Sequence, residues 1–71
     1  MNYKNKYQTH VNLKQYAEDV RGYLKARLGL NRFQASEILK GSEGIVSANW
    51  WNEKSIEETG EEILAKELIF G

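Results

Sequence analysis

The stretch of residues 31–41 most constrains the fold, because it carries a start signal, an apolar face and a stop signal within one short run. Asn31 is suited to cap the first backbone N–H groups of a helix, and Gln34 can reach back to complete a capping box. Gly41 is predicted to end the helix in the left-handed conformation. A helix of about nine residues is shorter than the roughly 12–15 that are marginal alone in water, so other helices must hold its apolar side chains. These side chains are Phe33, Ile38 and Leu39.

A second capping box of the Asn-x-x-Gln form starts the preceding helix, with Asn12 as the cap and Gln15 three residues later. At about 100° per residue, the apolar residues that follow form one arc of this helix. The arc consists of Leu13, Tyr16, Ala17, Val20, Tyr23, Leu24 and Leu28. Gly29 is predicted to end the helix, which leaves a short connection and makes the two helices a tight pair.

A third capping box, formed by Ser55 and Glu58, starts the last helix at Ile56. The predicted inner face of this helix consists of Ile56, Gly60, Ile63, Leu64 and Leu68. Gly60 lies in the middle of that face, where glycine costs about 1 kcal/mol relative to alanine. We therefore predict that another helix or an aromatic ring approaches Gly60 closely.

The segment between the second and the last helix has a less regular pattern. Val46, Ala48 and Trp50 alternate as in a strand, but no second strand is evident and a lone strand is not stable. A short helix or an ordered turn is therefore predicted. The predicted fold class is all-α, a small bundle of three main helices with a short irregular or helical segment around residues 45–54.

Residues 1–10 are polar and show no sustained period, and we predict that they form a mobile N-terminal arm. Tyr3 and Tyr7 flank Lys4 and Lys6 in this arm, a composition that stacks on bases and neutralises phosphates, although the arm has only two lysines. Residues 11–71 are predicted to form a single helical domain, because a chain of 71 residues can build one small core.

The composition excludes several classes of function. The chain has no cysteine, which rules out disulfides, thiolate metal sites and cysteine nucleophiles and fits a cytoplasmic location. No apolar run approaches the roughly 18 residues of a membrane span, and no signal-peptide pattern is present. The one histidine, His10, lies in the predicted arm, so no catalytic triad is expected. We expect neither an enzyme nor a bound cofactor, and no pattern sets an oligomeric state.

Four glutamates of the last helix, Glu57, Glu58, Glu61 and Glu62, lie at i, i+4 spacing and offer the oxygen ligands that divalent cations prefer. The first two also gain from the positive end of the helix dipole. A solvated acidic face explains the pattern, and no metal site is predicted.

Charge is distributed unevenly along the chain. Residues 1–40 hold eight Lys and Arg against three acidic residues, whereas residues 41–71 hold two lysines against seven glutamates, and the net charge is zero. This asymmetry fits either two surfaces for two partners or two halves that fold against each other, and we favour the second interpretation.

Lys14, Arg21 and Lys25 form a basic stripe on the first helix. With the arm, this stripe supports an alternative function, a small nucleic-acid-binding protein, but we favour the interpretation that the stripe is an ordinary solvated face. A helix-turn-helix is not predicted, because the segment in the recognition position holds one basic residue, Lys54.

Trp50 and Trp51 are adjacent and must point in different directions, so at most one of them is expected to be fully buried. An outward tryptophan is a frequent anchor in protein interfaces, although it can also cover the edge of a core. The predicted function is a small protein-interaction module, a regulator or inhibitor of a larger protein partner. The predicted partner-binding residues are Trp50, Trp51, Lys14, Arg21 and Lys25.

Two charged residues fall inside apolar arcs, Arg27 in the first helix and Glu67 in the last. A buried charge without a partner is very costly. We predict that the two residues pair across the helix interface, or that one of them pairs with a partner molecule.

Overall fold

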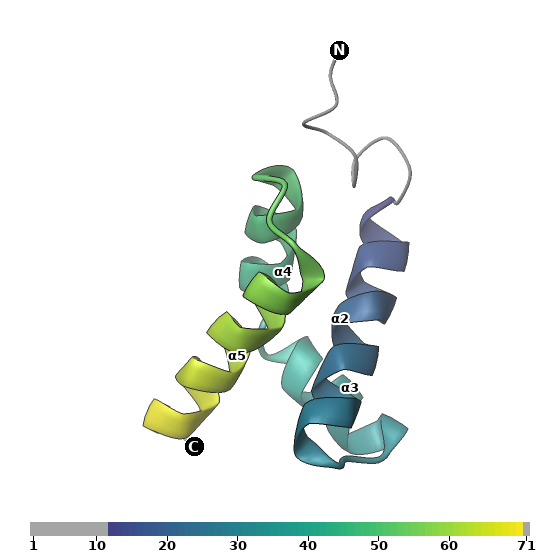
Figure 1. Cartoon of the computed structure of the whole chain (residues 1–71), viewed down its shortest axis with the longest axis vertical. Coiled ribbons are helices and arrows are strands. Elements are labelled where there is room, and N and C mark those ends of the chain that lie inside the picture. Colours follow the sequence, from purple (N-terminus) through teal and green to yellow (C-terminus); the bar gives the residue numbers. More distant parts are fainter. Residues whose placement is uncertain (1–11, 71) are drawn as a thin grey trace.

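The computed structural model describes residues 12–70 of the chain, with side chains up to residue 68, and the described residues form four helices and no strand (Figure 1). The helices are α2 (Leu13–Leu28), α3 (Arg32–Lys40), α4 (Glu43–Trp51) and α5 (Ile56–Phe70). The all-α prediction is confirmed. The segment expected to be irregular or helical is the regular helix α4, as long as α3, so the bundle has four helices rather than three main ones. The predicted arm, residues 1–10, lies outside the described residues.

Local caps define where the first described helix begins and ends. The Asn12 side chain accepts a hydrogen bond of 2.8 Å from the Gln15 N–H, as predicted. The Gln15 side chain donates to Asp19 instead of reaching back, so only half of the capping box is present. Gly29 has a left-handed φ of 65° and ends the helix, and the Leu30 N–H donates to the Lys25 carbonyl at 3.1 Å.

The other two predicted capping boxes are complete. Asn31 accepts from the Gln34 N–H at 2.8 Å, and the Asn31 N–H donates to the Gln34 side chain at 3.0 Å. Ser55 and Glu58 exchange the same two bonds, at 3.0 Å and 2.9 Å. In each box the side chains satisfy backbone donors that a helix start leaves without a partner.

The prediction for Gly41 is wrong, because this residue has φ −79° and ψ −3°, in the right-handed region. Its N–H donates to the Glu37 carbonyl at 3.3 Å, and the Ser42 N–H donates to the Leu39 carbonyl at 2.9 Å. Since only Gly41 and Ser42 separate α3 from α4, the chain keeps turning in the helical sense. It enters α4 without a left-handed reversal.

The core lies where α2 packs against α4 and α5, and α3 covers another side of α2. Its buried apolar residues are Tyr16, Val20, Leu24, Val46, Ile63 and Leu64. Four apolar side chains expected to face the core are exposed, and two of them, Leu13 and Leu28, lie at the ends of α2 and are 37% and 45% exposed. Phe33 is 72% exposed, because α3 presents the fully buried Ala35 to its neighbours instead. Leu68 is 85% exposed, because α5 diverges from α2 toward its C-terminal end (Figure 1).

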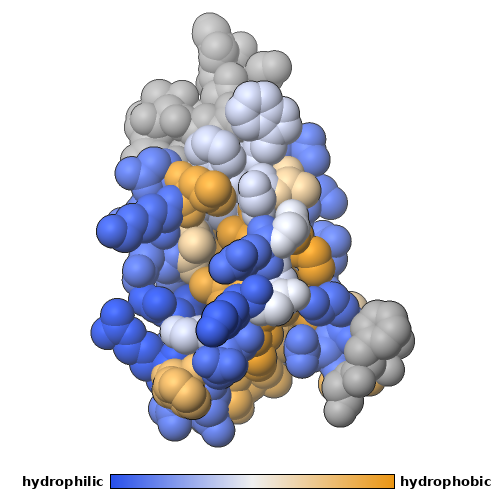
Figure 2. Space-filling model, turned by 180° about the vertical axis from the view of Figure 1, so that it is seen from behind, coloured by the Kyte–Doolittle hydropathy of each residue, from blue (hydrophilic) through white to orange (hydrophobic). Residues whose placement is uncertain are grey.

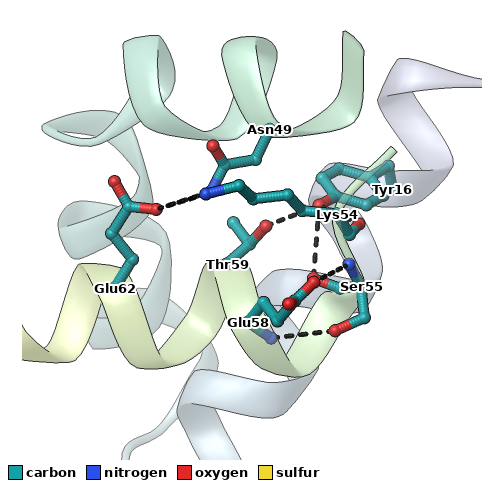
Figure 3. A network of polar contacts seen from close by, with 7 residues as sticks. All are labelled: Tyr16, Asn49, Lys54, Ser55, Glu58, Thr59 and Glu62. Carbon is teal, nitrogen blue, oxygen red and sulfur yellow. Dashed lines mark hydrogen bonds and ion pairs between the residues drawn. The ribbon is translucent and has the colours of Figure 1, made fainter. Parts of the chain in front are cut away.

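Polar contacts attach the start of α5 to the other helices (Figure 3). The Tyr16 hydroxyl lies 2.5 Å from the Thr59 hydroxyl and donates to the Lys54 carbonyl at 2.8 Å. Both side chains are fully buried. The buried Asn49 amide of α4 donates to Glu62 at 2.9 Å. Because hydrogen bonds are directional, these contacts fix the position of α5 more specifically than apolar packing alone.

The prediction for Gly60 is confirmed. Gly60 is buried, and a Cβ atom added there would overlap the ring of Tyr23. The Tyr23 hydroxyl donates to Glu61, the residue after Gly60, which also accepts from Arg27 Nε at 2.9 Å. The missing side chain at Gly60 therefore allows α2 and α5 to approach closely at this point.

The predicted pair of Arg27 and Glu67 does not form. Arg27 pairs with Glu61, and the two side chains are 51% and 45% exposed. Glu61 follows Gly60, where α5 approaches the Tyr23 ring of α2 closely, whereas Glu67 lies almost two turns further along α5. Both charged side chains of the Arg27–Glu61 pair remain in contact with solvent, so neither charge is deeply buried.

Candidate partner-binding groove

A groove with a volume of about 660 Å³ lies between α2, α3 and α4. Its apolar floor is formed by Leu13, Ala17, Leu39 and Val46. Figure 2 shows the molecule from the side of α3 and α4, where apolar atoms are exposed between strongly hydrophilic ones. We call this feature the α2–α4 groove.

The floor of the α2–α4 groove is the outer edge of the core. Val46 belongs to the core and is 4% exposed, Leu39 is half-buried, and Leu13 is 37% exposed. Leu13 and Ala17 are four residues apart and therefore lie on one face of α2. The small side chain of Ala17 leaves space between α2 and α4, and this space forms part of the hollow.

Three cations and one acid lie at the edges of the groove. Lys14 and Arg21 come from α2, Lys40 from α3 and Glu43 from α4. Arg21 pairs with Glu18 on the same helix. Lys14 and Lys40 form no ion pair with any residue in the described part of the chain. The groove therefore combines an apolar floor with an excess of positive charge.

The structure brings some of the predicted binding residues together and separates others. Lys14 and Arg21 both line the groove, but Lys25, one turn further along α2, does not. Trp51 is 69% exposed, and Trp50 is half-buried against the core. Trp51 follows the groove residue Ser47 by four positions, so it extends the same face of α4.

Sequence reasoning missed Lys40 and assigned Leu39 to the core alone. Both line the groove because of the angle at which α3 meets α2 and α4. No short sequence pattern predicts the angle between these helices. The small Ala17 within a row of large apolar residues is the one feature of the sequence that points to a hollow beside α2.

Three of the five glutamates of α5 make polar contacts within the described part of the chain. Glu58 caps its own helix, and Glu62 accepts from Asn49 and lies 4.0 Å from Lys54 Nζ. Hydrogen bonds from Arg27 and Tyr23 lower the pKa of Glu61 below its ordinary value. Among the described residues, no three acidic or histidine side chains converge in a way that could hold a metal ion.

No helix in the described part of the chain combines the length and the apolar character needed to cross a membrane. No protein-family model matches the chain, and neither the curated proteins nor the solved structures include a significant match.

Proposed function

We propose that the chain is a protein-interaction module that binds an acidic amphipathic helix of a larger protein in the α2–α4 groove. The observation that carries the proposal is the apolar floor bordered by Lys14, Arg21 and Lys40. A helix that docks in a groove buries apolar residues at i, i+3, i+4 and i+7 and keeps its polar residues at the rim. Glutamate or aspartate at that rim would face the three cations.

Trp51 supports the same proposal from the end of the groove. A large exposed aromatic side chain can cover one end of a docked helix and is a common anchor in interfaces. By covering a helix of its partner, the module would act as a regulator or inhibitor. The lack of cysteine supports the cytoplasm as the place of this interaction.

Binding to nucleic acid is the weaker alternative. Phosphate groups would meet the cations of the groove, but the polar backbone would also have to cover Leu13 and the other apolar atoms of the floor. Nucleic-acid affinity usually rests on many cation–phosphate contacts, and the excess charge of this groove is small.

The proposal can be tested with a designed peptide. The probe has about 18 residues, with leucines at i, i+3, i+4 and i+7 and glutamates beside them. Titration into the ¹⁵N-labelled chain is expected to shift the amide signals of groove residues, and the shifts should saturate. Saturating shifts confined to other surfaces, or no binding at all, would contradict the proposal.

Two variants of equal charge change make this test specific. Lys40→Glu is expected to weaken peptide binding about tenfold or more, because it places like charges opposite each other. Arg32→Glu is the control, since Arg32 is exposed on the same helix but does not line the groove. Equal weakening of peptide binding by both variants would indicate a long-range effect of charge rather than a docking site.

Duplex DNA is the second probe. Binding of DNA that falls steeply between about 50 and 200 mM salt would favour the nucleic-acid alternative.

A further inference from the structure

Helix α5 carries a continuous stripe of exposed residues on its solvent-facing side. Its inner side holds the buried Thr59, Gly60, Ile63 and Leu64. At 100° per residue, the exposed residues fall within an arc of about 140°. They are Glu57, Glu58, Glu61, Glu62, Ala65 and Leu68. We call this surface the α5 stripe.

The α5 stripe has an excess of negative charge. Arg27 pairs with Glu61, and Lys54 Nζ lies 4.0 Å from Glu62, so two cations stand against four glutamates and two negative charges remain. Glu57 is exposed and forms no ion pair with any described residue. The stripe can therefore attract a positively charged surface.

The C-terminal part of the α5 stripe is apolar. Leu68 is 85% exposed, and Ala65, three residues earlier, is exposed as well. This spacing places both on the face with which a helix enters a groove. The two residues lie where α5 diverges from α2, so this end of the helix projects from the bundle (Figure 1).

The α5 stripe and the α2–α4 groove are complementary but separate surfaces. The edges of the groove carry three cations and one acid, and no residue of α5 lines it. Among the described residues, one ion pair, that of Arg27 and Glu61, joins residues 1–40 to residues 41–71. The uneven charge of the sequence thus remains largely on two surfaces of the molecule that do not meet within one copy.

We infer that the α5 stripe of one copy occupies the α2–α4 groove of another, so that the chain associates head to tail. This occupancy rests on the proposed function, because the stripe is an acidic helix face of the kind that the groove is proposed to bind. The chain has zero net charge, so the copies do not repel each other at long range. Since the interface joins two different patches, an open assembly keeps one free groove and one free stripe.

This association regulates access to the groove. An acidic helix of the larger partner would compete with the α5 stripe for the same cations and the same apolar floor. Binding of the partner would therefore dissociate the assembly, and a high concentration of the chain would weaken apparent binding of the partner.

Sedimentation equilibrium of the full chain tests the association over concentrations from about 10 μM to about 1 mM. At about 20 mM salt, the mean mass is expected to rise with concentration above that of one copy, 8.2 kDa. At about 300 mM salt the rise should be smaller, because salt screens the charges. The glutamate peptide, which requires no variant, should lower the mean mass of the wild-type assembly.

Mixing two variants tests which surfaces meet. The Lys14→Glu and Lys40→Glu double variant has an altered groove, and Leu68→Lys has an altered stripe. Each alone should associate at least about tenfold more weakly than the wild type. An equimolar mixture should form a 1:1 complex, because the intact stripe of the first fits the intact groove of the second. Phe33→Lys is the matched control, since Phe33 is 72% exposed and lies outside both surfaces.

Three results would overturn the head-to-tail assembly. They are a mass that stays at 8.2 kDa over the whole range, a mixture that associates no more strongly than its components, and self-association that responds to Phe33→Lys but not to Leu68→Lys. If the glutamate peptide still binds the groove in these cases, the proposed function stands and the self-association alone is wrong. If neither the peptide nor a second copy binds there, both are wrong.

Discussion

Helix α2 has two interfaces that differ in how completely they are closed. Toward the N-terminal half of α5, Gly60 lets the Tyr23 ring lie against the helix, and the Tyr16 hydroxyl bonds to Thr59 at 2.5 Å in a buried site. Toward α3 and α4, a hollow remains above Leu39 and its neighbours. The contrast indicates that the α2–α5 interface stabilises the fold, and that the α2–α4 groove is available for a partner.

The polar groups at the two interfaces differ in the same way. The buried Thr59 hydroxyl has a partner, whereas the Ser42 hydroxyl, 2% exposed in the turn between α3 and α4, has no hydrogen-bond partner among the described residues. A buried polar group without a partner costs free energy. The turn between α3 and α4 thus holds a buried hydroxyl without a partner among the described residues, whereas the hydroxyl buried between α2 and α5 has one.

The largest difference between the two interfaces should appear on truncation of an apolar side chain. Ile63 is fully buried beside α2, so Ile63→Ala is expected to lower the free energy of unfolding by about 2–5 kcal/mol. Leu13 is 37% exposed on the floor of the groove, and Leu13→Ala should cost less than about 1 kcal/mol. Urea unfolding measures both values. Equal losses would show that the groove is part of the stabilising core.

Gly60→Ala tests the close approach of α2 and α5. The new methyl group would overlap the Tyr23 ring, so a loss of about 1–3 kcal/mol is expected despite the better helix propensity of alanine. In a Tyr23→Ala background the overlap is absent, and the same change should stabilise the chain by about 1 kcal/mol. Thermal unfolding of the wild type, the two single variants and the double variant gives the coupling. If Gly60→Ala has the same effect in both backgrounds, the ring does not occupy this space.

Ser42→Ala tests the turn between α3 and α4 and should stabilise the chain. It removes a buried hydroxyl that makes no side-chain bond at the start of α4, so the free energy of unfolding should rise by about 1 kcal/mol. Thr59→Val, its counterpart at the α2–α5 interface, removes a bonded hydroxyl and should destabilise. Denaturation midpoints of the two variants that shift in the same direction would contradict the comparison.

The smallest expected effect is a pH dependence of the free energy of unfolding, which arises from Glu61 at the rim of the α2–α5 interface. Bonds from Arg27 and Tyr23 lower the pKa of Glu61 below 4.5, so the stabilisation is complete above that value and is lost as pH falls through the lower, folded-state pKa. The stability difference between wild type and Glu61→Gln should therefore shrink in acid. Equilibrium unfolding at a series of pH values measures this difference, and a difference that grows in acid would contradict this account.

Features that depend on a few neighbouring residues were predictable from the sequence. The boxes at Asn31 and Ser55 are complete because a cap and its partner lie three residues apart on one turn. The buried row of α2 follows from helical periodicity, and Gly60 was identified because glycine is unfavourable within a helix. These signals require no knowledge of how the helices cross.

Features that depend on the angles between helices were not predictable. Phe33 and Leu68 are apolar and lie on plausible inner faces, but the directions of α3 and α5 turn them toward solvent. The turn at Gly41 depends on how soon α4 begins. The α2–α4 groove arises in the same way, since Lys14 and Lys40 are far apart in sequence and meet only through the packing of their helices.

A reversal of charge specificity tests the central claim, that the α2–α4 groove binds an acidic helix, most directly. The wild-type chain should bind the glutamate peptide at least about tenfold more tightly than the same peptide with lysines. A Lys14→Glu and Lys40→Glu double variant should show the opposite preference in isothermal titration calorimetry. If the double variant keeps the preference of the wild type, the acidic helix does not bind in this groove.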